Sequence, residues 1–121
     1  MEADQIHWIT EMIIEDGKLD TFKELAGGLV EAVHETEPDT LVYDYHIRED
    51  GSKCFVNELY ADTEAALTHM NGKAGEYIPQ ILEIADINTM ILLSQVENQE
   101  LRDGLKQFDA QFTEFYQGFS R

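Results

Sequence analysis

The stretch that decides the fold covers residues 36–69 and reads TEPDTLVYDYHIREDGSKCFVNELYADTEAALTH. Within it, Asp50-Gly51 separates two segments, 41–47 and 53–61, in which apolar and polar residues alternate. An Asp-Gly pair between alternating segments is a strong signal for a β-hairpin with a two-residue turn. We therefore predict a hairpin here, followed by a short helix that ends near His69.

The turn determines which residues of the two strands lie opposite each other. With Asp50 and Gly51 as the loop, the predicted cross-strand pairs are Ile47–Cys54, Tyr45–Val56, Tyr43–Glu58 and Leu41–Tyr60. Because these residues share one face of the sheet, the register predicts that three tyrosines and one carboxylate lie together. The opposite face carries Val42, Asp44, His46, Phe55, Asn57 and Leu59. This second face is also partly apolar, so we expect both faces to be covered at least in part.

The segments on either side of the hairpin complete the order of elements. Residues 6–14 alternate like a strand, and residues 18–35 carry a helical apolar stripe. Gly27-Gly28 interrupts that stripe and indicates close packing or a bend. A helix capped by Asp62 or Thr63 follows the hairpin, and then come a short helix over 77–84 and an apolar strand over 87–96 that we expect to be buried on both sides. The order predicts an α+β, ferredoxin-like βαββαβ fold with a four-stranded antiparallel sheet.

The C-terminal segment predicts a helical extension over about 98–119. Its apolar residues recur every three or four positions, which would form a continuous seam on a helix. They are Leu101, Leu105, Phe108, Phe112, Phe115 and Phe119. A seam of this size must be covered, and we expect it to pack on the sheet or on a second subunit rather than to form a groove for a peptide or lipid.

Composition limits the classes of function. A chain of 121 residues predicts a single domain, 1–121, with a core over about 6–96. The net charge of -17 argues against binding to nucleic acid or to an anionic membrane, since both require basic patches. Cys54 is the single cysteine, which excludes an intramolecular disulfide, and the first residues lack the pattern of a secretion signal. No apolar run approaches the roughly 20 residues of a membrane-spanning helix, so we expect a cytoplasmic protein.

With the order of elements established, the chain resembles the antibiotic biosynthesis monooxygenase (ABM) family of the dimeric α+β barrel superfamily. The segments that carry the resemblance are IHWITEMII, DTFKELAGGLVEAV, TEPDTLVYDYHI, VNELYAD and EAALTHM. The resemblance implies a homodimer in which two sheets face each other, with helices outside and a ligand cavity in each subunit. The family includes oxygenases that use neither metal nor flavin, relatives that bind and degrade haem, and members that act on quinols or small signalling molecules.

The resemblance gives the hairpin face a chemical interpretation. A cofactor-free oxygenase needs an electron-rich substrate, such as a phenol or hydroquinone, and a base that deprotonates it. His69 is the predicted base, because an imidazole accepts protons at neutral pH, while Glu58 and Tyr45 would orient the substrate. The alternatives are that His69 binds backbone carbonyls at a helix end and that Glu58 makes a structural hydrogen bond to a tyrosine.

Three aromatic residues are predicted to bind the ligand: Trp8, Tyr43 and Tyr60. Aromatic residues on strands more often belong to a core or interface, so this alternative stays open for all three. Asp44, His46 and Asn57 form a predicted polar cluster on the opposite face, where a dimer interface is favoured over a ligand site. His7 and His34 have no partner in the sequence pattern and are assigned to the surface.

The sequence contains no recognisable cofactor motif. It lacks HExxH, paired cysteines and a Gly-rich phosphate loop, which argues against metal and nucleotide sites. The haem-degrading relatives would require a proximal histidine after the third strand, where only His69 is available, and because the sequence lacks the flanking pattern of those relatives, haem is disfavoured. The leading hypothesis is therefore a cofactor-independent monooxygenase acting on a small aromatic or quinol-like substrate. The alternatives are a non-catalytic dimeric ligand-binding or structural protein, and an isomerase-type proton-transfer enzyme on the same fold.

Overall fold

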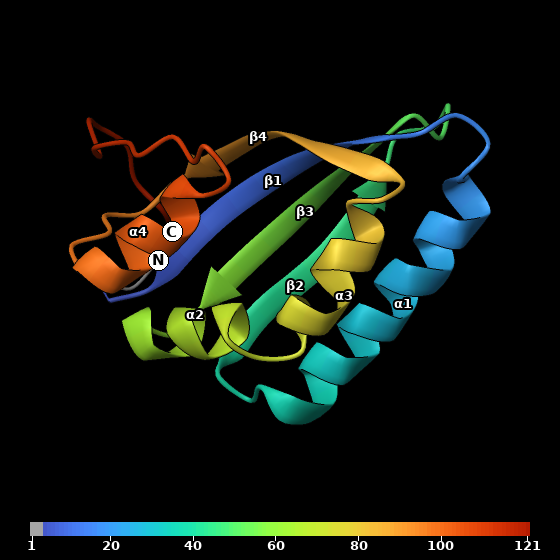
Figure 1. Ribbon diagram of the computed structural model, residues 1–121. Helices are drawn as coiled ribbons and strands as arrows, with labels where there is room; N and C mark the ends of the chain where they lie inside the picture. Colours follow the sequence, from blue (N-terminus) through green and yellow to red (C-terminus); the bar gives the residue numbers. More distant parts are fainter. Residues whose placement is uncertain (1–3) are drawn as a thin grey trace.

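The protein is built on a four-stranded antiparallel sheet, and the helices pack on one of its faces (Figure 1). The computed structural model describes residues 4–121. The elements, in chain order, are β1 (Ile6–Ile14), α1 (Leu19–Thr36), β2 (Thr40–Ile47), β3 (Lys53–Tyr60), α2 (Thr63–Met70), α3 (Ala74–Ile81), β4 (Ala85–Leu92) and α4 (Gln99–Lys106). The strands lie in the order β2-β3-β1-β4, which confirms the α+β, ferredoxin-like prediction.

The hairpin register agrees with the sequence prediction over most of its length. Ile47 pairs with Cys54, Tyr45 with Val56 and Tyr43 with Glu58. The predicted pair Leu41–Tyr60 is wrong, because the register shifts between Thr40 and Val42 and Tyr60 pairs with Thr40 instead. Such a bulge inserts one extra residue into a strand. It leaves Leu41 on the exposed surface.

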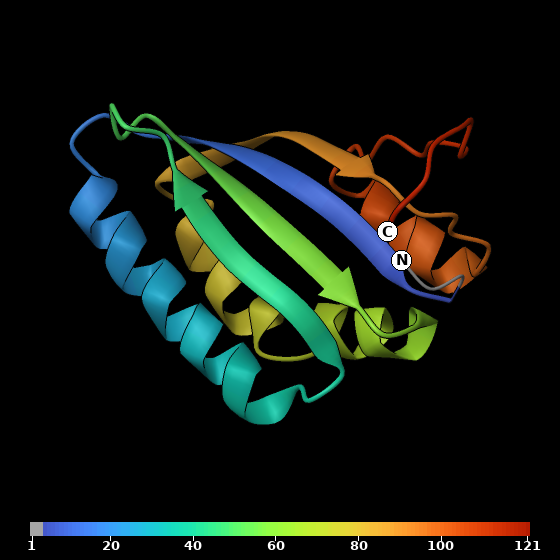
Figure 2. The ribbon, with the colours of Figure 1, turned by 180° about the vertical axis from the view of Figure 1, so that it is seen from behind.

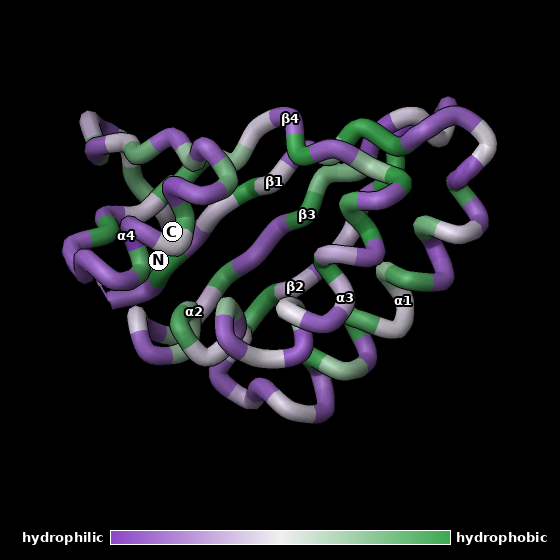
Figure 3. Tube along the Cα trace, viewed as in Figure 1, coloured by the Kyte–Doolittle hydropathy of each residue, from purple (hydrophilic) through white to green (hydrophobic). Residues whose placement is uncertain are grey.

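The helices cover the sheet face that carries the tyrosines, and the core is divided into two clusters. One lies under α1 and α3 and is centred on Phe22, Leu29 and Ile81, and the other lies under α2 and α4 and is centred on Trp8, Tyr60 and Leu101. Hydrophobic and hydrophilic segments alternate along α1 (Figure 3), as expected for a helix with one buried face.

The other face of the sheet is not covered by any helix of the described residues 4–121. Figure 2 views the molecule from this side, with the strands in front of the helices. We call it the open face; it carries Ile9, Phe55 and Leu59, and the Phe55 side chain is 39% exposed. The expectation that both faces are covered therefore holds for only one face of the single chain.

Local sequence signals explain the helices beside the cavity. The Asp62 carboxylate accepts a hydrogen bond from the Ala65 backbone N–H at 2.8 Å and caps α2. A Cβ on Gly28 would lie 3.0 Å from Cε1 of Tyr77 on α3, so the predicted close packing is confirmed at this glycine. The third helix and fourth strand begin and end earlier than predicted, at 74–81 and 85–92. The prediction that this strand is buried on both sides is wrong, because Ala85, Met90 and Leu92 are buried whereas Asp86 and Asn88 are exposed.

The predicted C-terminal helix is confirmed only in its first part. Helix α4 ends at Lys106, and Asp109 adopts a left-handed conformation (φ 57°) that ends the helical path. The chain then runs along the edge of β4, where the backbone N–H of Gln111 donates to the Met90 carbonyl at 2.8 Å. The prediction of a continuous helical seam to residue 119 is therefore wrong, and the Phe115 side chain is 83% exposed.

In the part of the chain that the structure describes, no helix combines the length and apolar character required to cross a membrane.

Candidate active site

A cavity of about 390 Å³ lies between the sheet and the helices. Its floor comes from the strand face that the hairpin register predicts, and its walls come from α2, α3 and the segment after α4. The lining residues are Trp8, Thr10, Met12, Tyr43, Tyr45, Glu58, His69, Met70, Ala74, Gly75, Ile78, Pro79, Leu82, Ile87, Met90 and Phe108. Most of these are apolar, which is typical of a small-molecule site with a few oriented polar groups.

Glu58 is the carboxyl group on the cavity floor, and it is only 6% exposed. Its Oε2 accepts hydrogen bonds from Trp8 Nε1 at 2.7 Å and Thr10 Oγ1 at 3.3 Å, and its Oε1 accepts one from the Tyr60 hydroxyl at 2.6 Å. Burial raises the pKa of Glu58 above its ordinary value, although His69 and the three donors act in the opposite direction. A carboxyl group in this setting is suited to exchange protons with a ligand.

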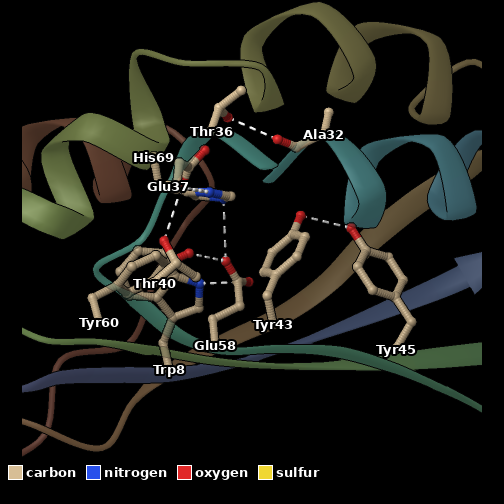
Figure 4. Close-up of polar contacts among 10 residues, drawn as sticks. All are labelled: Trp8, Ala32, Thr36, Glu37, Thr40, Tyr43, Tyr45, Glu58, Tyr60 and His69. Atoms are coloured by element: carbon tan, nitrogen blue, oxygen red, sulfur yellow. Dashed lines mark hydrogen bonds and ion pairs between the residues drawn. The ribbon is translucent and has the colours of Figure 1, made fainter. Parts of the chain in front are cut away.

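His69 lies in the last turn of α2 between two carboxylates (Figure 4). Its Nε2 is 3.5 Å from Glu58 Oε1, and its Nδ1 is 3.0 Å from Glu37 Oε1. The imidazole is 4% exposed and lies 4.9 Å, centroid to centroid, from the Tyr43 ring. The ring nitrogens thus face side-chain carboxylates, in contrast to the backbone carbonyls of the alternative interpretation.

Two tyrosine hydroxyls form the second polar group of the cavity. The hydroxyls of Tyr43 and Tyr45 are 2.9 Å apart and hydrogen-bonded to each other. Burial raises the pKa of both side chains, so both are neutral at ordinary pH. One of the two hydroxyls donates its proton to the hydrogen bond between them. The proton of the other hydroxyl can therefore be donated to a ligand oxygen.

The structure brings together most of the predicted site residues. Trp8, Tyr43, Tyr45, Glu58 and His69 all line the cavity. Tyr60, which we predicted to bind the ligand, does not line it; this fully buried side chain instead donates to Glu58 and packs on the Trp8 ring at 4.8 Å.

Sequence reasoning missed the role of Glu37. This residue caps the C-terminus of α1, just before Pro38, and its carboxylate contacts His69 from the side opposite Glu58. The sequence gives no signal for this role, because contact with a residue 32 positions later leaves no local pattern.

The predicted polar residues are neighbours on the open face, where Asp44 is the cross-strand partner of Asn57, but their side-chain hydrogen bonds form two separate pairs. His46 Nε2 lies 2.9 Å from Asp44, whereas Asn57 contacts His7 at 2.7 Å. His7 is therefore partly buried and paired, in contrast to the isolated surface position expected for it. Among residues 4–121, no three side chains of His, Cys, Asp or Glu are arranged to hold a metal ion.

Comparison with known proteins identifies the family. The sequence model described as Antibiotic biosynthesis monooxygenase matches residues 6–76, which is more than half of the chain. The chain belongs to the ABM family. The match spans β1 through the start of α3, and so includes Trp8, Glu37, Glu58 and His69. No curated protein matches the chain.

Solved structures share the ABM fold with this chain. MupZ from Pseudomonas fluorescens is 24% identical, with a TM-score of 0.83 over 98% of this chain and 95% of MupZ. Rv0793 from Mycobacterium tuberculosis is 15% identical, with a TM-score of 0.65 over 78% of this chain and 98% of its own. A Nitrosomonas europaea protein, provisionally named an antibiotic biosynthesis monooxygenase, is 14% identical, with a TM-score of 0.68 over 79% of this chain and 94% of that protein. The MupZ match thus extends into the C-terminal segment.

Proposed function

We propose that the protein is a cofactor-independent monooxygenase that oxidises a small aromatic or quinol-like substrate. The observation that supports this proposal is the Glu58–His69 pair, in which Glu58 on the floor and His69 on a wall of an apolar cavity bring Oε1 and Nε2 within 3.5 Å. Glu58 and His69 together form the base, and the neutral hydroxyls of Tyr43 and Tyr45 hold a substrate oxygen. Membership of the ABM family supports the assignment to oxygen chemistry.

The proposed chemistry begins with removal of a substrate proton. Deprotonation of a hydroquinone makes it electron-rich enough to pass electrons to dioxygen, and the apolar walls limit access of water to the reacting species. Overall, the hydroquinone and dioxygen give a hydroxyquinone and water. The substrate supplies all four electrons, and one oxygen atom enters the product.

Dioxygen uptake across a panel of hydroquinones tests this proposal. We expect uptake above the buffer rate with the wild-type protein and a loss of about 100-fold in His69→Gln, as is typical for removal of a general base. His34→Gln is the matched control, because His34 is an exposed histidine on α1 and should leave the rate unchanged. If the wild-type protein causes no uptake above the buffer rate, the oxygenase proposal is wrong for that panel.

The same geometry supports a second candidate, an isomerase-type proton-transfer enzyme. A carboxyl group and an imidazole on one side of the cavity can remove a proton and return it elsewhere on the substrate. Deuterium incorporation from heavy water into a ketone under nitrogen, followed by NMR, would favour this candidate. A ligand that raises the melting temperature without either reaction would favour a non-catalytic binding protein.

We also propose that the protein is a homodimer that pairs through the open face. A large apolar surface on a soluble protein generally marks an interaction site, and the exposed Phe55 and Ile13 side chains lie here. The polar contacts His46–Asp44 and His7–Asn57 would then lie within or at the edge of the interface.

A further inference from the structure

Glu37 is a buried carboxylate that does not line the cavity. It is 5% exposed, and its Oε1 accepts a hydrogen bond from Thr40 Oγ1 at 2.9 Å besides contacting His69. Its Oε2 has no hydrogen-bond partner among residues 4–121. Buried polar atoms nearly always pair with protein or with water. Since the described residues give this oxygen no partner, the next question is whether water can reach Glu37.

Two surface hollows meet at Glu37. One, of about 210 Å³, lies between the end of α1 and the start of α2, and the other, of about 320 Å³, lies between the end of α1 and the start of α3. Thr36, Glu37 and Thr68 line both hollows, whereas His69 and Glu58 line only the cavity. Each hollow is large enough to admit several water molecules. Glu37 therefore stands between His69 and solvent, on a route separate from the cavity.

We propose that Glu37 and His69 form a proton relay that connects Glu58 in the cavity with water in the two hollows. A proton taken from the substrate by Glu58 passes to His69 Nε2, while the Nδ1 proton passes to Glu37 Oε1. Glu37 then releases one proton to water, so one proton enters and one leaves without any oxidant or reductant. The 3.5 Å between Nε2 and Glu58 exceeds a hydrogen bond, and catalytic hydrogen bonds often tighten only when substrate binds.

The relay deepens the proposed acid–base function, because it lets Glu58 return to its starting state while a substrate or product still fills the cavity. The competing explanation is structural: the Glu37–His69 contact ties the end of α1 to the end of α2. The two explanations differ in how fast the buried His69 ring proton exchanges with water. A relay carboxylate speeds that exchange, whereas a purely structural hydrogen bond protects the proton and slows it.

The test is NMR magnetisation transfer between water and the His69 ring N–H, using isotope-labelled histidine in the ligand-free protein. We expect the exchange rate in Glu37→Gln to fall by at least about tenfold, since a side-chain amide cannot accept a proton from His69 and release it to water as a carboxylate does. Glu35→Gln, which removes one charge from an exposed position at the same helix end, should exchange at the wild-type rate. Because no substrate is present, failure of the relay and failure of the oxygenase proposal are seen separately.

A second variant tests the route without changing the buried network. Thr68 is exposed on α2 and lines both hollows, so Thr68→Leu should limit access of water to Glu37 and also slow the exchange. Slower exchange in both variants supports the relay. Unchanged or faster exchange in folded Glu37→Gln overturns it, and so does an unchanged rate in Thr68→Leu if Glu37→Gln does not fold.

Discussion

Glu58 is a carboxyl group on which two opposing influences act. Three hydrogen-bond donors and the His69 imidazole favour its charged form, but burial disfavours that form more strongly, and the pKa of Glu58 is raised. A carboxyl group stabilised only by donors would stay ionised at all ordinary pH values and would be a weak base. Burial is therefore what makes this residue useful for proton transfer, and it is also a cost to stability.

This cost predicts a pH dependence of stability. A group with a raised folded-state pKa contributes stability that is fully present below its unfolded value, near 4.5, and is lost as the pH rises through the folded value. We expect the free energy of unfolding of the wild-type protein to fall, relative to Glu58→Gln, as the pH rises from about 4.5. Denaturant unfolding of both proteins across this range provides the measurement. If the free energy of unfolding depends on pH in the same way in both proteins, the pKa of Glu58 is not raised by folding.

At the scale of elements, Gly27 and Gly28 of α1 are adjacent glycines in different surroundings. A Cβ on Gly27 would meet no atom within 4 Å, whereas one on Gly28 would lie 3.0 Å from the Tyr77 ring on α3. Replacing a helical glycine by alanine typically stabilises by about 1 kcal/mol when there is space. We expect Gly27→Ala to raise the free energy of unfolding by about that amount and Gly28→Ala to gain less or to lose stability, because Tyr77 must move.

Denaturant unfolding of the two alanine variants, each compared with the wild-type protein, tests this difference. The pair controls for helix propensity, since both substitutions change the same residue type in the same helix. Equal gains in the two variants would mean that Tyr77 moves aside freely, and that α1 and α3 are not closely packed at Gly28.

The elements of this fold could be predicted from the sequence where local chemistry decides them. The Asp-Gly turn gave the hairpin register from Ile47 to Tyr43, and the Asp62 cap gave the start of α2. The failures occurred where a distant segment overrides the local pattern. The helical spacing of residues 98–119 was real, but beyond Lys106 the edge of β4 offers the backbone of Gln111 hydrogen bonds that compete with a helix.

The candidate site shows the same division at the scale of the whole molecule. Residues on the predicted strand face, such as Trp8, Tyr43 and Glu58, were found because strand alternation places them together. Glu37 was missed because its contact with His69 depends on how the end of α1 meets the end of α2. Sequence pattern thus identified the cavity floor, but the proton route behind it depends on tertiary packing.

The proposed dimer leads to the last prediction, because the open face has to be desolvated when two subunits associate. Phe55 projects from the middle of that face and is 39% exposed in the single chain. Phe55→Glu would place a charge in an apolar interface between two chains that each already carry a net charge of -17. We expect the dissociation constant of the dimer to rise by at least about 100-fold, which is the effect of removing a central aromatic contact.

Sedimentation equilibrium at micromolar concentration would measure this change. Thr21→Glu adds the same charge at an exposed position on α1, on the other side of the sheet, and should leave the association unchanged. Because Phe55 is exposed in the single chain and belongs to neither core cluster, the Phe55→Glu monomer should keep its fold. A monomeric mass for the wild-type protein, or equal weakening by both substitutions, would show that the open face is not the dimer interface.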